Sequence, residues 1–333
     1  MRDTKFSLGV LEMLRQVEDP RLNRQKLHCL FDVLAISLLA SLCGANSFVQ
    51  MEDYGKSNEA WLKTFLALEN GIPSHDTFNR VFSLLDPKGF SSCLLEVVTA
   101  VSRKGSVGET LALDGKSLRR SFDKAKKKSP LHLVSAFATQ THLLLGQVKT
   151  HEKSNEIRVM PELLARLDIA GKVVTIDAMG CQKEIAKQIK EQKGEYVLAV
   201  KGNQGALLDE VQTLFRYEKQ QKHKKALVYT EVDKAHGRIE TRRCSVLACP
   251  ASLPSKASWA GIQSLIEVQS TREMGEKTTQ ETRYYISSLQ PDPNRLLTSI
   301  RGHWGIENVL HWGLDVAFLE DLCRVRKKTL QRI

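Results

Sequence analysis

Three features that would place this chain in a membrane or an oxidising compartment are missing from its sequence. The longest apolar stretch, residues 34–43, is interrupted by two serines and is shorter than the roughly 20 residues that a membrane-spanning helix needs. The N-terminus lacks the apolar core of a signal peptide. The 7 cysteines form no framework of spacings, and the close pair Cys244 and Cys249 lacks the second pair or histidine doublet of a zinc site. We expect a cytoplasmic protein with free, buried thiols and no membrane span.

Excess charge of either sign is also missing from the first third of the chain. Residues 1–105 carry 12 Lys and Arg against 12 Asp and Glu, so the whole net charge of +11 lies in residues 106–333. Such segregation is typical of a polyanion-binding domain that follows a neutral one. A pI near 9.3 is also common among bacterial cytosolic proteins, so charge alone leaves nucleic-acid binding as one of two interpretations.

Residues 1–105 have the apolar spacing of helices. Residues 26–40 repeat apolar side chains every three or four positions, and Ser74 can cap a helix whose apolar face includes Phe78 and Phe82. Short helices around a proline-containing turn fit either a helix-turn-helix or a small helical bundle. The neutral charge of the segment favours the bundle.

Residues 106–205 alternate strand and helix signals in the order of an α/β fold. Their patterns predict three antiparallel strands over 110–149, then helix, strand, helix and a last strand that ends near residue 201. This order predicts a ribonuclease-H-like mixed sheet flanked by helices, antiparallel on one side and parallel on the other. Short strand patterns predict a β-rich insertion over 206–290, after which the core resumes with helical spacing over 291–333.

Three acidic residues occupy positions where an α/β sheet presents ligands. Asp114 and Asp177 each follow an apolar run of strand length, and Glu307 lies in a stretch with helical spacing. Carboxylates that meet at a sheet edge can hold Mg²⁺, and two such ions suit phosphodiester chemistry in a basic protein. An acidic residue after a strand is also frequent as a helix cap or turn residue, so a structural role remains the alternative for each of the three.

Five segments around these acids resemble the ISAs1-type transposases, a group that includes the H-repeat-associated proteins and lies within the IS4-like DDE class. The segments are residues 111–120, 175–182, 199–204, 236–242 and 301–321. The resemblance extends over nearly the whole chain. It implies a ribonuclease-H-like catalytic core, an N-terminal helical domain, and a β-rich insertion between the second and third acids.

The resemblance also implies roles for individual residues. Asp114, Asp177 and Glu307 fall on the catalytic, metal-binding triad. The wider class has a Tyr-x2-Arg-x3-Glu-x6-Lys signature, whose other positions hold Ile300, His303 and Leu314 in this chain, so only the glutamate matches. The departure puts the phosphate contacts of the wider class in doubt here.

Nine residues near the acids are candidates for DNA contact. They are Lys116, Arg119, Arg120, Lys201, Asn203, Gln204, Arg301, His303 and Trp304. Basic side chains beside an active-site strand can follow the DNA backbone, although the run after Asp114 also fits a solvated loop. Trp304 fits either base stacking or helix packing.

We therefore expect a DDE transposase that uses Mg²⁺, in two sites and with Mn²⁺ able to substitute. It would cleave DNA at the ends of an insertion element and join the ends to target DNA, as a homodimer in the DNA complex. The resemblance implies a further helical segment beyond the position of Ile333, so a catalytically inactive DNA-binding remnant is the alternative. A nuclease without strand transfer is a third interpretation.

Overall fold

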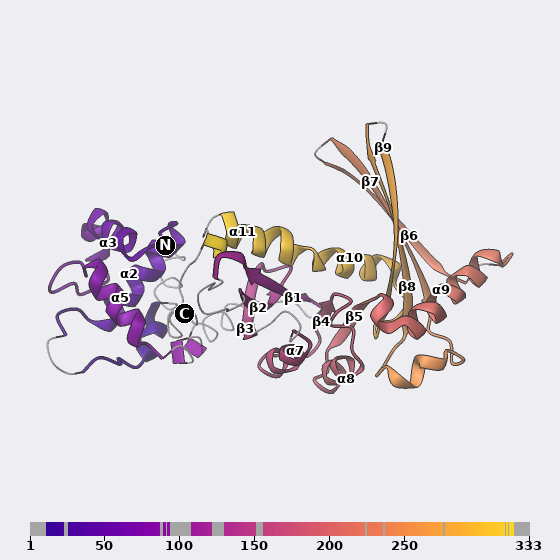
Figure 1. The fold of residues 1–333 in the computed structure, drawn as a ribbon, viewed down its shortest axis with the longest axis horizontal. Coiled ribbons are helices and arrows are strands. Elements are labelled where there is room, and N and C mark those ends of the chain that lie inside the picture. The colour runs from indigo at the N-terminus through magenta and orange to yellow at the C-terminus, as the bar shows by residue number, and fades with distance from the viewer. Residues whose placement is uncertain are drawn as a thin grey trace. The chain divides into compact units, whose positions relative to one another are not determined.

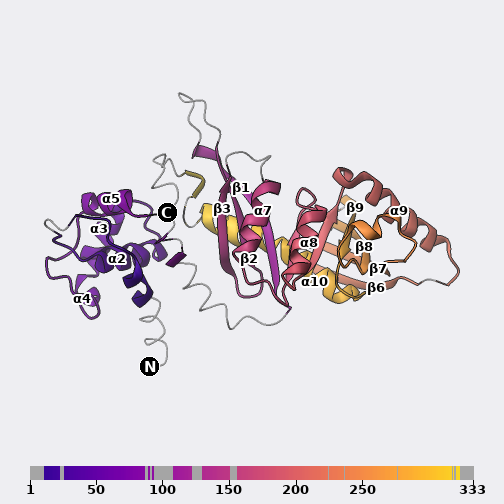
Figure 2. The same ribbon diagram turned by 90° about the horizontal axis from the view of Figure 1, so that it is seen from below.

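The computed structural model describes residues 11–22, 26–86, 89–90, 92–93, 108–121, 130–150, 156–223, 225–235, 237–275, 277–316, 318 and 320–322 (Figures 1 and 2). The chain divides into two compact units. The helical unit comprises Met1–Lys104, Ser117–Leu131 and His311–Ile333, and the sheet unit comprises Gly105–Lys116 and His132–Leu310. Each is described separately below.

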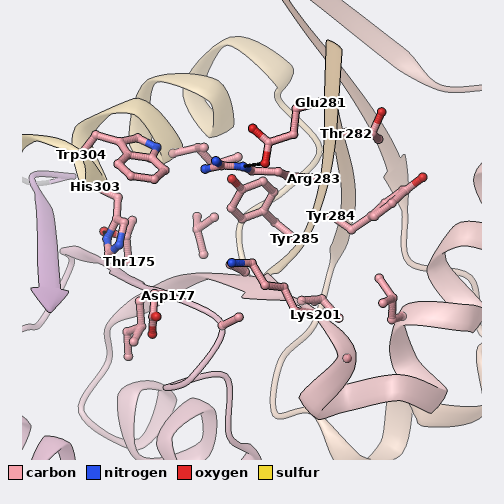
Figure 3. A pocket seen from close by; sticks show the side chains of 18 of the residues that line it. Thr175, Asp177, Lys201, Glu281, Thr282, Arg283, Tyr284, Tyr285, His303 and Trp304 are labelled. Atoms are coloured by element: carbon pink, nitrogen blue, oxygen red, sulfur yellow. Dashed lines mark hydrogen bonds and ion pairs between the residues drawn. The ribbon is translucent and has the colours of Figure 1, made fainter. Parts of the chain in front are cut away.

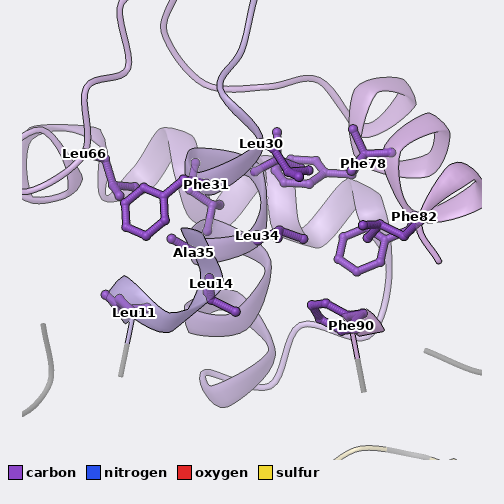
Figure 4. Packing of buried hydrophobic residues seen from close by; sticks show 14 of the residues in the cluster. Leu11, Leu14, Leu30, Phe31, Leu34, Ala35, Leu66, Phe78, Phe82 and Phe90 are labelled. Atoms are coloured by element: carbon purple, nitrogen blue, oxygen red, sulfur yellow. The ribbon is translucent and has the colours of Figure 1, made fainter. Parts of the chain in front are cut away.

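The helical unit has its own apolar core. Its elements up to residue 84 are η1 (Leu14–Gln16), α2 (Leu30–Leu42), α3 (Phe48–Ser57), α4 (Glu59–Leu62) and α5 (His75–Leu84). Side chains from η1, α2 and α5 meet in one cluster with Phe90 (Figure 4). Ser74 stands at the N-cap of α5 as predicted, but its side chain makes no cap hydrogen bond, because its hydroxyl is turned toward the Thr77 hydroxyl 3.3 Å away. The unit also contains η2 (Arg119–Ser121), α11 (Trp312–Val316) and η7 (Glu320–Leu322).

The described strands form one sheet in the order β3-β2-β1-β4-β5-β9-β8-β7-β6. Its first part consists of β1 (Thr110–Leu118), β2 (Leu131–Ala138), β3 (Leu143–Thr150), β4 (Val173–Ile176) and β5 (Glu195–Val200). The pair β2–β3 is antiparallel, while β1, β4 and β5 run parallel. The Thr139 amide, just after β2, donates to the Thr110 carbonyl at the start of β1, so these two strands run in opposite directions. The predicted ribonuclease-H-like mixed sheet is confirmed.

The predicted β-rich insertion continues this sheet. It contains β6 (Leu227–Ala235), β7 (Arg238–Ala248), β8 (Ser264–Met274) and β9 (Lys277–Ser287), all antiparallel to their neighbours. Strand β9 pairs with β5, matching Tyr285 with Ala199. The insertion and the core therefore share one run of backbone hydrogen bonds.

Helices cover both faces of the sheet. Helices α7 (Glu156–Ala165) and α8 (Lys183–Glu191) lie on one face, and α10 (Pro293–His303) lies on the other (Figures 1 and 2). Helix α10 packs against β4, β5, β6 and β7, while α9 (Gly205–Gln220) packs against β9. None of the described helices combines the length and apolar character needed to cross a bilayer.

The cysteines follow the sequence prediction only in part. All those in the described ranges are free, and Cys93, Cys181, Cys244 and Cys249 are buried. Cys29 and Cys43 are exposed, because they flank helix α2 instead of facing the core. The prediction that the thiols are buried is therefore wrong for Cys29 and Cys43.

Candidate active site

The register of two parallel strands brings Asp114 and Asp177 to the same edge of the sheet. The pairing of β1 with β4 ends where Leu113 meets Ile176, and the two aspartates are the next residues on their strands. The prediction that a strand ends at Asp114 is wrong, because β1 continues to Leu118 alongside β2. Asp114 instead marks the point where β1 loses its partner β4. There its carboxylate is open to the cavity at the strand ends.

A tight turn fixes the carboxylate of Asp177. Its Oδ1 accepts hydrogen bonds from the amides of Met179, at 3.0 Å, and Gly180, at 3.3 Å. A side chain at Gly180 would place Cβ 2.2 Å from Cγ2 of Ile176, so the turn needs glycine for lack of space. The carboxylate is thus oriented by backbone amides at the end of a buried strand.

Glu307 approaches from the helical layer. Helix α10 ends at His303, and Glu307 is the second residue of η6, a π-helical segment over Ile306–His311. Ile306 anchors this segment, since it is fully buried against Ala112 and Phe137. π-Helical turns are rare and are often found at functional sites.

The three carboxylates line one cavity of about 480 Å³. Burial raises the pKa of Asp114 to about 7, and the negative charges of Asp177, Glu307 and Glu156 raise it further. The cavity thus concentrates negative charge around a carboxyl group that is withdrawn from water, which is the condition under which a bound cation is favoured.

The donor set fits a hard divalent cation in its chemistry. Carboxylate oxygens are the ligands that Mg²⁺ prefers. Within the described part of the chain, however, no three Asp, Glu, His or Cys side chains lie close enough together to hold a metal ion as placed. Glu307 is exposed, and bringing its carboxylate to the two aspartates would need a cation to offset the repulsion between the like charges.

A buried contact between a histidine and a glutamate lies beside Gly115, the residue after Asp114. His132 of β2 and Glu156 at the start of α7 are 2% and 3% exposed and form a salt bridge. A Cβ added at Gly115 would lie 2.5 Å from Oε1 of Glu156 and 2.6 Å from Nε2 of His132. The position after Asp114 must therefore be glycine for the pair to fit.

Several predicted DNA-contact residues have structural partners instead. The side-chain amide of Asn203 donates to the Ala178 carbonyl at 2.5 Å, and that of Gln204 donates to the Cys181 carbonyl at 2.9 Å. Both amides therefore hold the turn that carries Asp177. Arg301 pairs with Glu231 and Asp233 of β6 and lies outside the cavity lining.

His303 also makes a structural contact. Its Nδ1 lies 3.2 Å from the Thr175 hydroxyl, which itself lies 3.4 Å from the Leu111 carbonyl. Since the hydroxyl donates to that carbonyl, it accepts from Nδ1–H of the histidine. Burial lowers the pKa of His303, against the opposing influence of Asp177. His303 thereby ties α10 to β4.

Lys201 and Trp304 are the two remaining DNA-contact candidates that line the cavity. Lys116 lies outside the lining, and Arg120 is exposed on the helical unit. The Arg119 side chain lies outside the described residues, as does the predicted basic run over residues 124–128.

Sequence reasoning missed a group of cavity residues on β9. Glu281, Arg283 and Tyr285 line the cavity together with Lys201 and Trp304 (Figure 3). Arg283 and Tyr285 lie in a strand predicted over residues 282–287, but nothing in the sequence indicated that this strand returns beside β5. The pairing of β9 with β5 places them next to the strand ends that carry the acids.

Two family models match this chain. The model described as "Transposase DDE domain" matches residues 105–333, and that described as "DDE_Tnp_1-associated" matches residues 11–98. The H repeat-associated putative transposase YhhI of Escherichia coli (strain K12) is 39% identical over 323 residues, covering 96% of this chain and 85% of that protein. The putative transposase YncI of Escherichia coli O157:H7 is 40% identical over 323 residues, covering 96% and 82%.

Two further comparisons are less informative about function. An uncharacterized protein in the dhlA 3′ region of Xanthobacter autotrophicus is 43% identical over 278 residues, covering 83% of this chain and 93% of that protein. The cryo-EM structure of the piggyBac transposase synaptic complex with hairpin DNA aligns with a TM-score of 0.44 and 14% identity, over 93% of this chain and 68% of that one. A likeness of that degree carries no argument about this chain.

Proposed function

This chain belongs to the family of transposases with a DDE domain, and on that premise we propose that it cleaves DNA at the ends of an insertion element and joins those ends to target DNA. One observation carries the proposal. The strand register delivers Asp114 and Asp177 side by side, and the helical layer adds Glu307 to the same cavity. Three carboxylates in one cavity would suit phosphodiester chemistry with divalent cations.

The reaction comprises two phosphoryl transfers that balance without an external energy source. In the first, water attacks the phosphorus at an element end, the P–O3′ bond breaks, and the 3′-oxygen takes up a proton. In the second, that 3′-hydroxyl attacks a target phosphorus, so that one phosphodiester forms as another breaks. Divalent cations, Mg²⁺ or Mn²⁺ in two sites, would supply an acidified water and offset charge on the leaving oxygen.

The residues of the chain orient these groups. Asp114 and Asp177 would hold one cation between them, and Glu307 would help to hold the second. The Met179 and Gly180 amides keep the Asp177 carboxylate aimed into the cavity. Lys201, at the end of β5 and in the same lining, would contact a DNA phosphate. Because an element has two ends, we further propose a homodimer in the DNA complex.

The test is an end-cleavage assay with the purified chain, Mg²⁺ or Mn²⁺, and duplexes that carry the termini flanking its gene. We expect Asp114→Asn, Asp177→Asn and Glu307→Gln to bind DNA but to cut none. Asp168→Asn is the matched control, because Asp168 is an exposed acid of the same unit, and we expect it to cut normally. Cleavage by a purified Asp177→Asn protein would refute the assignment.

A DNA-binding remnant without activity is the second candidate. The spacing of the acids, which is too wide to hold a metal ion as placed among the described residues, favours it. The same assay separates the candidates, since a remnant shifts the duplex on a gel and cuts it with neither cation. A nuclease without strand transfer would yield cut ends and no joined product.

A further inference from the structure

Residues 281–285 of β9 make one wall of the cavity. Residues two apart on a strand point to the same face, so Glu281, Arg283 and Tyr285 form one row. Figure 3 shows this row facing Lys201 and Trp304, while Thr282 and Tyr284 point the other way. The row belongs to the insertion, yet it shares the cavity with the three acids.

Arg283 is held in a defined place by three side chains, those of Trp304, Glu281 and Tyr285. Its guanidinium carbon lies 4.8 Å from the centre of the Trp304 ring, and its Nε donates to Oε1 of Glu281 at 2.7 Å. Tyr285 is buried beside it. Contact with the face of an aromatic ring restrains the plane of the guanidinium and leaves its edge available for hydrogen bonds.

Glu281 is the partner of Arg283 that an incoming anion can displace. Its side chain is 58% exposed, against 35% for Arg283. The hydrogen bond from Arg283 lowers the pKa of Glu281, and the charges of Lys201 and Arg272 lower it further. The Glu281 carboxylate therefore sits where several positive charges act together, and an exposed pair of this kind contributes little to stability.

A phosphodiester is the ligand that suits this place. It carries one negative charge, like the carboxylate, and its two free oxygens can accept both N–H groups of a guanidinium edge. Among the described residues of the lining, Lys201 and Arg283 carry the permanent positive charges, and Nδ1 of His303 is engaged with the Thr175 hydroxyl. Arg283 thus provides the guanidinium of this cavity.

We propose that Arg283 binds a backbone phosphate of DNA in the cavity, and that Glu281 holds its guanidinium in place until the phosphate replaces the carboxylate. This inference rests on the proposed function, since it takes the DNA at the carboxylates as the ligand. It assigns to the insertion a direct part in holding the strand that is cut.

The inference is tested by the binding of a fluorescein-labelled duplex of about 30 base pairs, measured by anisotropy in EDTA at several salt concentrations. Phosphate contacts carry no sequence information, so a generic duplex is a valid probe. We expect Arg283→Ala to weaken binding about three- to tenfold at low salt and to reduce the slope of log K against log salt by about one. Arg283→Lys should keep the native salt slope and regain part of the affinity. Lysine restores the positive charge but not the parallel N–H donors of the guanidinium.

Replacing Glu281 should have the opposite effect on the affinity for DNA. Glu281→Gln should tighten binding, because the competing carboxylate is gone while the side-chain size is kept. The exposed pair Arg166 and Glu162 on α7, which form an i,i+4 contact, provides matched controls, and Arg166→Ala and Glu162→Gln should leave the affinity unchanged. Thermal unfolding of each variant confirms that it is folded.

The results separate the inference about Arg283 from the proposal that the chain cleaves DNA. Unchanged affinity and salt slope in a folded Arg283→Ala protein would overturn the inference, and so would unchanged or weaker binding by Glu281→Gln. If the native chain binds DNA through Arg283 but never cleaves it, the inference stands and the cleavage proposal fails. If cleavage occurs but Arg283→Ala binds normally, only the inference fails. A native chain that does not bind the duplex overturns both.

Discussion

The carboxyl groups of the site are held in quite different ways. Asp177 accepts two backbone amides, whereas Asp114 is withdrawn from water and faces other acids. An isolated buried carboxylate is unfavourable unless its charge is compensated. Burial of the Asp114 carboxylate therefore lowers the free energy of unfolding when the group is ionised. This effect on stability can be measured without any substrate.

The first prediction concerns the pH dependence of unfolding. Burial raises the pKa of Asp114 from its ordinary value of 3.8 to about 7, so the folded state keeps a proton that the unfolded state releases. Stability contributed by this group is present at low pH and is lost as pH rises through that window. Relative to Asp114→Asn, the native chain should lose about 2–3 kcal/mol between pH 5 and pH 8 in EDTA.

Urea unfolding of both proteins at the two pH values measures this difference. Millimolar Mg²⁺ at pH 8 should restore part of the loss in the native chain only, since a bound cation compensates the charge. Parallel pH dependence of the two proteins in EDTA would show that Asp114 is not the group responsible.

The second prediction concerns the glycine behind Asp114. In Gly115→Ala the new Cβ would meet Glu156 and His132 at 2.5–2.6 Å, and both side chains are buried and paired. We expect a loss of about 1–3 kcal/mol in unfolding free energy, typical of overpacking, and impaired cleavage, because Asp114 must shift with its neighbour. Gly205→Ala is the control, since nothing lies within 4 Å of its Cβ. Equal unfolding midpoints for the two variants would contradict the crowding argument.

At the scale of elements, the sequence predicted the parts of the core that local patterns determine. The apolar runs before Asp114 and Asp177 form adjacent strands, as predicted. These strands pair in parallel, and their register places the two aspartates together. The strand carrying Arg283 was recognised, but its place was not, because pairing between β5 and β9 joins residues almost 90 positions apart. The Asn203 and Gln204 contacts were missed for a similar reason, since a strand-end amide serves a neighbouring turn as readily as DNA.

The third prediction concerns helix α10, which presents His303 and leads to Glu307. Asp292 caps it by accepting from the amides of Asn294 and Arg295, both at 3.1 Å. Asp292→Ala should cost about 1 kcal/mol, the usual effect of losing an N-cap, and should lower the urea midpoint accordingly. Thr298→Ala, an exposed position on the same helix, should leave the midpoint unchanged or slightly raised. A larger loss in Thr298→Ala than in Asp292→Ala would show that the cap is unimportant.

At the scale of the whole chain, the insertion is predicted as a separate segment over residues 206–290. Its strands nevertheless complete the sheet unit. One apolar cluster joins Val173 and Val197 of the core strands to Cys244 and Ile266 of the insertion and to Leu297 of α10. No pattern within residues 206–290 reveals this, because each strand alternates as a half-buried strand would in any sheet.

The last prediction follows from that shared cluster. Replacing residues 206–290 by a short Gly-Ser linker would expose β5 as an edge and remove one side of the packing around α10. At about 25 cal/mol per Å² of apolar surface, the loss of several fully buried side chains exceeds the 5–15 kcal/mol that stabilises a typical domain. We expect this variant to lose the cooperative transition of the sheet unit by circular dichroism and to keep that of the helical unit, which has its own core. Shortening only the β8–β9 tip, over residues 271–280, should leave the midpoint nearly unchanged, because the side chains described there, over 271–275 and 277–280, are exposed or half-buried. Cooperative unfolding of the sheet unit in the linker variant at the native midpoint would mean that the sheet core is independent of the insertion, and that Arg283 reaches the cavity from a detachable element.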